Sequence, residues 1–161
     1  LEVYFARIKQ GYEALRMPEE CELWCEPGRA LVASGASLLV RVELRRGRQL
    51  YINDGMFGSL SDFQYPAFTP PMRAIRPGAL PSDEQESFTL FGPTCDSEDV
   101  MRGPYSLAAD IAEGDWIEIG QWGAYSSAFR THFNGFFSDR RVIVDDPPFM
   151  PMHEPVVAAA E

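Results

Sequence analysis

The stretch Cys25-Glu26-Pro27-Gly28-Arg29 combines residue types that can bind a charged ligand. It follows the apolar run 23–25, which predicts a strand over 22–25, and its Pro-Gly pair predicts a sharp turn. Arg29 would then open a helix over 30–39, so that backbone N–H groups and a guanidinium meet one anion. Glu26 does not suit an anion, but it suits a ligand that also carries a protonated ring nitrogen. A plain strand-to-helix turn with a surface Glu–Arg pair is the alternative.

A second dense stretch, Gly92-Pro93-Thr94-Cys95-Asp96, follows another apolar run. The Gly-Pro pair favours a tight turn, and loops in such places often carry function. A thiol at Cys95 can donate a proton, and a carboxylate at Asp96 can hold an ammonium group. A simple turn capped by an aspartate is the alternative for this pentapeptide.

Two aromatic loops follow later in the chain. In Gly120-Gln121-Trp122-Gly123-Ala124-Tyr125 two glycines flank a sharp loop, and the Tyr125 hydroxyl can donate to a phosphate. A buried tyrosine with a satisfied hydroxyl is the alternative. Thr131-His132-Phe133-Asn134-Gly135-Phe136 predicts an aromatic turn. We interpret His132 as structural because no partner motif accompanies it.

The apolar pattern divides the chain into two parts. Apolar residues spaced by three and four along 1–15 predict a helix, and with the strand and helix that follow they are typical of the closing units of an α/β barrel. Alternation and turn residues predict strands further on, at 40–44, 50–52, 72–75, 88–91, 116–119, 129–133 and 141–144. We expect 92–104 to form a loop. The domains are therefore predicted as an α/β piece, 1–39, and an all-β unit, 40–161.

Composition excludes several classes of function. The 161 residues suit one domain, and a net charge of −10 argues against nucleic-acid binding and favours a cationic substrate. No apolar run approaches the length that spans a bilayer, so no membrane association is predicted. Three cysteines without a secretory signal predict reduced thiols and a cytoplasmic protein. Their spacing does not suit zinc, and no metal is expected.

Taken in order, these motifs resemble the C-terminal half of the fold-type III pyridoxal-phosphate-dependent decarboxylases, which act on ornithine, lysine, arginine or diaminopimelate. The matching residues are Glu26-Pro27-Gly28-Arg29, Asn53-Asp54-Gly55 with Gly58, Gly92-Pro93-Thr94-Cys95-Asp96, Gly114-Asp115, Gly123-Ala124-Tyr125 and Phe133-Asn134-Gly135-Phe136. The Cys95-Asp96 pair looks like the ornithine decarboxylase branch. The implied fold class is α+β: the last βα units of a TIM-type barrel, followed by a mainly antiparallel Greek-key β-barrel or sandwich.

The resemblance implies a cofactor, pyridoxal 5'-phosphate, and residues that bind it. Glu26 would pair with the protonated ring nitrogen, which keeps the ring an effective electron sink. Gly28 and Arg29 would hold the cofactor phosphate, with Tyr125 as a further contact.

The resemblance also implies catalytic residues and a partner subunit. Cys95 would protonate the product carbon, and Asp96 would bind the terminal ammonium of a small cationic amino acid. Both would reach the active site of the other subunit in a homodimer, with Phe133 near the interface. The implied reaction converts L-ornithine to putrescine and CO2 in polyamine biosynthesis.

The chain departs from the family pattern in two ways. Its only lysine, Lys9, has no cofactor-lysine setting, so we expect the Schiff-base lysine upstream, the chain to be a fragment, and the fragment alone to be inactive. Pro66 stands where ornithine decarboxylases carry a second substrate-binding aspartate, and Asp62 is a tentative substitute. Phe57 also stands where many relatives carry tyrosine. Three alternatives remain: a lysine/ornithine decarboxylase of broader specificity, a non-catalytic decarboxylase-like binding or regulatory protein, and a β-barrel interaction module in which the Gly-anchored loops are coincidental.

Overall fold

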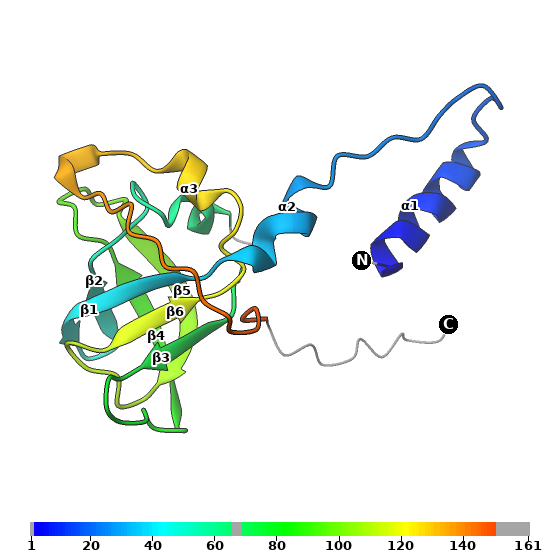
Figure 1. Cartoon of the computed structure of the whole chain (residues 1–161). Coiled ribbons are helices and arrows are strands. Elements are labelled where there is room, and N and C mark those ends of the chain that lie inside the picture. The colour runs from blue at the N-terminus through cyan, green and yellow to red at the C-terminus, as the bar shows by residue number, and fades with distance from the viewer. Residues whose placement is uncertain (1, 66–68, 151–161) are drawn as a thin grey trace.

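The computed structural model describes residues 2–65 and 69–150, and its body is one six-stranded sheet (Figure 1). The strands are β1 Leu38–Arg46, β2 Gln49–Ile52, β3 Met72–Ile75, β4 Gln85–Phe91, β5 Val100–Ala108 and β6 Trp116–Ile119. They lie in the order β3-β6-β1-β2-β4-β5. Neighbours pair antiparallel, except that β2 and β4 run parallel.

The sheet curls because its two outer strands meet. β3 and β5 stand at opposite ends of the strand order, yet they contact each other. The result is a half-barrel of mixed strands, which confirms the expectation of a mainly antiparallel β unit at this level.

Apolar side chains, which alternate with polar ones along the strands, fill the half-barrel. Val40 and Val42 of β1 are fully buried, and they lie opposite Ile117 of β6 and Ile52 of β2. Burying one such side chain contributes about 1.5–3 kcal/mol. The buried apolar cluster comprises Val40, Val42, Leu50, Ile52, Leu60, Phe88, Leu90, Met101, Tyr105, Leu107, Ile111, Ile117, Ile119 and Trp122.

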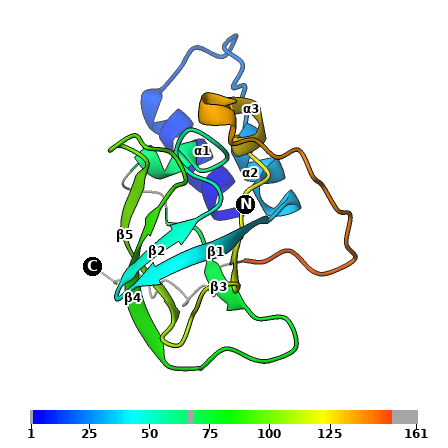
Figure 2. The same ribbon diagram turned by 90° about the vertical axis from the view of Figure 1, so that its left-hand side faces the viewer.

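The helices are short except for the first. α1 spans Glu2–Leu15, has no buried residue and stands apart from the sheet at the end of an extended segment (Figure 1). It confirms the helix predicted over 1–15, of which Leu1 lies outside the described residues. The other helical segments are α2 Gly28–Val32, α3 Ser126–Phe129 and the 3-10 turns η1 Ala33–Gly35, η2 Ser61–Gln64 and η3 Phe133–Gly135. α2 and α3 gather at one end of the sheet (Figure 2).

Two predictions for the first part of the chain were wrong. Residues 22–25 form no strand, and Trp24 is 82% exposed, because no neighbouring strand supplies a ladder there. The helix predicted over 30–39 ends at Val32, and a 3-10 turn leads directly into β1 at Leu38. The apolar residues at 38 and 39 therefore belong to a strand that pairs with β6.

Three predictions for the later part of the chain were also wrong. The loop expected over 92–104 gives way to β5 at Val100, and Gly103-Pro104 lies inside that strand. Residues 129–133 are the last residue of α3, a loop and the first residue of η3, and 141–144 belong to no strand. Ile143 is 98% exposed, so its apolar character does not report a buried strand.

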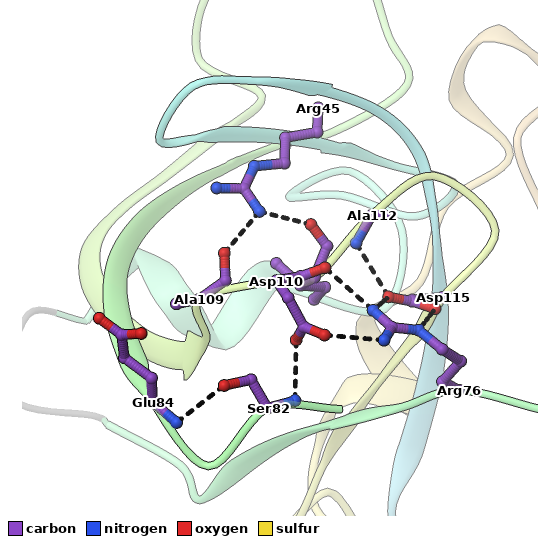
Figure 3. Close-up of polar contacts among 9 residues, drawn as sticks. Arg45, Arg76, Ser82, Glu84, Ala109, Asp110, Ala112 and Asp115 are labelled. Atoms are coloured by element: carbon purple, nitrogen blue, oxygen red, sulfur yellow. Dashed lines mark hydrogen bonds and ion pairs between the residues drawn. The ribbon is translucent and has the colours of Figure 1, made fainter. Parts of the chain in front are cut away.

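An ion network joins Arg76, the residue after β3, to the turn between β5 and β6 (Figure 3). Arg76 donates to both carboxylate oxygens of buried Asp115, at 2.9 and 2.7 Å, and to Asp110 at 2.8 Å. Asp110 in turn accepts from the Ser82 N–H, and Arg45 donates to two carbonyls of the same turn. The network closes one end of the half-barrel with charged groups that are all partnered.

The network perturbs the acid–base properties of its members. The hydrogen bonds that Arg76 donates to Asp115 and Asp110 raise the pKa of Arg76. The Arg76 guanidinium and the Ser82 N–H lower the pKa of Asp110. Burial opposes ionisation of Asp115, but the Arg76 guanidinium and the Ala112 N–H leave its pKa below the ordinary value. All three groups are therefore held in their charged forms.

No helix among the described residues is long and apolar enough to cross a bilayer. All three cysteines are free thiols, two of them exposed and Cys21 half-buried.

Candidate functional site

The first part of the candidate site surrounds Arg29, on the first turn of α2. Its Nη1 donates to Asp62 Oδ2 at 2.9 Å and to the Ala124 carbonyl at 2.5 Å. Its guanidinium also lies 5.2 Å from the centre of the Tyr125 ring. Three segments, α2, η2 and the loop after β6, thus meet at one cation.

Tyr125 lies directly against the start of α2. A Cβ added at Gly28 would overlap the Tyr125 hydroxyl, so only glycine allows this approach. The structure therefore brings together the three residues predicted to hold a phosphate, Gly28, Arg29 and Tyr125. A guanidinium and a phenol beside a bare backbone are chemically suited to a phosphate group, so these residues fit the cofactor that the resemblance implies.

Asp62 has a contact that the sequence did not predict. Its carboxylate is 4% exposed, pairs with Arg29 and accepts the Tyr125 N–H at 3.4 Å. A substrate ammonium group would have to displace Arg29 to reach it. Binding of substrate by Asp62 stays a prediction, and Pro66, which motivated it, lies outside the described residues.

Glu26 is exposed on the segment just before α2. Its carbonyl accepts the Gly28 N–H at 2.9 Å, which turns the chain sharply at Pro27. The turn predicted from the Pro-Gly pair is therefore present, although the strand before it is not. The pairing of Glu26 with a ring nitrogen stays a prediction.

The second part of the candidate site is the loop between β4 and β5. Cys95 and Asp96 are exposed at its tip. Asn134 Nδ2 lies 3.5 Å from Cys95 Sγ, so the aromatic turn predicted over 131–136 reaches the thiol. Two motifs that lie far apart in the sequence therefore meet at the proposed proton donor.

The aromatic turn is anchored near the same loop. The Phe133 ring lies 4.7 Å from that of Phe57, and Thr131 donates twice to the Phe57 carbonyl. Phe133 is 41% exposed and Phe136 44% exposed. An open cavity of about 760 Å³ separates this turn from the ends of β2 and β4, with Asp96 and Phe136 among its lining residues.

One residue of this part was missed by sequence reasoning. Asp99 is 2% exposed, and its carboxylate accepts three hydrogen bonds from two loops. The signal was available, because a third carboxylate follows Cys95 and Asp96 within four positions. Acidic residues in a short loop are usually exposed to solvent, so composition alone does not predict that one of them is buried.

Comparison with known proteins identifies the relatives of this chain. Residues 31–123 match the family model described as the C-terminal sheet domain of pyridoxal-dependent decarboxylases. Ornithine decarboxylase of Schizosaccharomyces pombe is 35% identical over 132 residues, which cover 74% of this chain and 31% of the relative. Antizyme inhibitor 2 of Xenopus laevis is 31% identical over 135 residues, covering 73% of this chain and 29% of the relative.

Solved structures agree with these relatives. The structure of lysine/ornithine decarboxylase from Vibrio vulnificus, complexed with putrescine, superposes with a TM-score of 0.59 at 33% identity. The superposition covers 77% of this chain and 34% of the neighbour. The chain thus spans about a third of the length of the relatives that it matches.

Proposed function

Because the chain belongs to the pyridoxal-dependent decarboxylases, whose C-terminal sheet domain it matches, we propose that the whole protein converts L-ornithine to putrescine and CO2. The observation that carries the proposal is the meeting of Cys95 with Asn134, which places the thiol of the predicted proton donor on an exposed, anchored loop. Residues 1–39 would complete an upstream TIM-type barrel, and the exposed apolar side chains of α1 support that assignment.

The residues around Arg29 would bind the cofactor. Gly28, Arg29 and Tyr125 would hold its phosphate, and Glu26 would keep its ring nitrogen protonated. When bound, pyridoxal phosphate supplies the electron sink that makes loss of CO2 feasible. The Arg29 guanidinium is already oriented by Asp62 and the Ala124 carbonyl, which limits its loss of freedom on binding.

The loop between β4 and β5 would complete the reaction. The C–CO2 bond breaks, and the Cys95 S–H supplies the proton that takes its place on the same carbon. Asp96 would pair with the terminal ammonium group and so select for chain length. In a homodimer these two residues would serve the partner's cofactor, with Phe133 near the interface.

The test compares wild-type and Cys95→Ala whole enzyme with L-ornithine as substrate. Without the donor, the amount of putrescine falls and the share of transamination product rises. An unchanged yield of putrescine with no extra transamination would remove Cys95 from the mechanism. Glu26→Gln is the companion variant, and full activity in it would remove Glu26 from the electron-sink role. This chain alone is expected to be inactive, because its only lysine, Lys9, lies exposed on α1 without a cofactor-lysine setting.

Two alternatives share the same fold. A decarboxylase that accepts lysine as well as ornithine is supported by the name of the Vibrio vulnificus neighbour, and measuring cadaverine release from lysine separates it. A non-catalytic regulatory protein is supported by the similarity to antizyme inhibitor 2. The complete absence of amine release from either substrate by the whole protein would favour that alternative. Cytoplasmic location stays a prediction.

A further inference from the structure

We propose that Asp99 is a positioning residue that fixes the loop carrying Cys95 and Asp96. The inference rests on the proposed function, because it gives that loop a part in the reaction. Asp99 acts through its neighbours and does not itself touch the reacting atoms.

The Asp99 carboxylate joins two loops. Its Oδ1 accepts the Met56 N–H at 2.7 Å, from the turn after β2. Its Oδ2 accepts the N–H and the hydroxyl of Thr94, at 3.0 and 2.7 Å. Thr94 directly precedes Cys95, so the carboxylate is one residue away from the proposed proton donor.

The backbone of Asp99 closes the same loop. Its N–H donates to the Asp96 carbonyl at 3.1 Å, and its carbonyl accepts the Gly92 N–H at 2.8 Å. Side chain and main chain together therefore fix both ends of the pentapeptide 92–96. The Gly92 N–H, the Thr94 N–H and the Asp96 carbonyl are all bonded to Asp99.

Glycines on both sides let the carboxylate approach. A Cβ at Gly55 or at Gly92 would overlap the Asp99 carboxylate in either case. The two glycines belong to motifs that sequence analysis singled out separately, Asn53-Asp54-Gly55 and Gly92-Pro93-Thr94-Cys95-Asp96. Both positions need glycine because they line the socket, the space between Gly55 and Gly92 that the Asp99 carboxylate occupies.

The chemistry demands a carboxylate at this position. All three side-chain partners are donors, and an ionised aspartate only accepts. In Asp99→Asn one of the two oxygens becomes an NH2 group. This NH2 group would face the N–H of Met56 or of Thr94, and two donors cannot form a hydrogen bond with each other. The substitution conserves the shape of the side chain but removes at least one hydrogen bond that holds the loop.

The experiment uses the whole enzyme carrying Asp99→Asn. Alkylation of Cys95 by iodoacetamide is followed by mass spectrometry of the peptide that contains it, and the ratio of putrescine to transamination product is measured in parallel. We expect a several-fold change in the alkylation rate and a several-fold larger share of transamination. Glu98→Gln is the matched control, because it removes a neighbouring but exposed carboxylate and should leave both readouts unchanged.

A second pair of variants keeps the proposal testable if Asp99→Asn fails to fold. Thr94→Val removes the hydroxyl that Asp99 accepts, whereas Thr94→Ser retains it. Thr94→Val should shift both readouts in the direction of Asp99→Asn, and Thr94→Ser should restore them.

Two results would overturn the proposal. One is an unchanged alkylation rate in Asp99→Asn. The other is a changed rate with an unchanged product ratio, while Cys95→Ala does alter that ratio; Asp99 would then serve the loop but not the reaction. If Cys95→Ala itself leaves the ratio unchanged, the proposed function fails instead, and the alkylation rate still reports whether Asp99 holds the loop.

Discussion

Two buried carboxylates, Asp115 and Asp99, each hold a loop of the half-barrel, but they use different partners. Both carboxylate oxygens of Asp115 accept hydrogen bonds from the Arg76 guanidinium, and one of them also accepts a backbone N–H. Asp99 accepts two backbone N–H groups and one hydroxyl. The first arrangement neutralises charge, whereas the second fixes the path of two backbones. We infer that the pairing of Asp115 serves stability and that the socket of Asp99 serves the geometry of the candidate site.

The largest effect is expected from breaking the ion pair between Asp115 and Arg76. Asp115→Asn removes the buried one of the two carboxylates that pair with Arg76, and it should lower the free energy of unfolding by about 2–3 kcal/mol. Equilibrium urea unfolding measures the change. Asp110→Asn is the control, because its side chain is 45% exposed and its loss should be clearly smaller. Equal losses in the two variants would contradict the assignment.

The second largest effect is expected where the Asp99 carboxylate meets backbone groups. Gly92→Ala places a methyl group against the Asp99 carboxylate, and the overlap should cost about 2 kcal/mol of unfolding free energy. Hydrogen exchange of the N–H groups in 92–99 should rise at the same time. Gly35→Ala is the control, because nothing lies within 4 Å of its Cβ position. A neutral Gly92→Ala would mean that the socket is looser than described.

Asp62 sharpens the comparison, because it combines a guanidinium with a backbone N–H. Asp62→Asn should cost about 1–2 kcal/mol, less than Asp115→Asn, since the Arg29 side chain is 37% exposed. Urea unfolding again measures it. Glu43→Gln is the control, because its pair with Arg41 is 46% exposed on both sides and should contribute little. A loss larger than that of Asp115→Asn would reverse the ranking.

The smallest expected effect is a change in the dependence of stability on pH. Folding lowers the pKa of Asp110 and Asp115, so their contribution is present above the ordinary aspartate pKa of about 3.9 and is lost as the pH falls below it. Asp115→Asn should therefore flatten the decline of unfolding free energy below about pH 4. Urea midpoints at several pH values measure the slope. An unchanged slope would mean that other carboxylates dominate acid unfolding.

Local sequence predicted the strands with clear periodicity. β3 and β6 were predicted with their observed bounds: a turn at Gly114-Asp115 marks the start of β6, whereas β3 was predicted as one short strand in a stretch without a clear period. β5 was missed, because Gly103 and Pro104 lie inside it and such residues usually end a strand. Here β5 pairs with β4 alone, at the end of the strand order, where a missing N–H is tolerated.

The candidate site was predicted as residue types but not as a network. Gly28, Arg29 and Tyr125 were named from the sequence and do converge. The contact of Asp62 with Arg29 joins positions 33 residues apart, and that of Asp99 with Met56 joins positions 43 apart. No local pattern reports such pairs, because they depend on how the sheet closes.

The parallel pairing of β2 with β4 has a consequence for folding. Parallel neighbours cannot be joined by a tight turn, so a long excursion runs from Ile52 to Gln85, and it passes through β3 at the far end of the strand order before the chain enters β4. The turn that Asp99 grips lies at the start of this excursion. Such non-local closure raises contact order and slows the search for the native topology. We therefore expect the Cys95 loop to reach its final shape among the last events of folding, after the β1–β2 hairpin has formed.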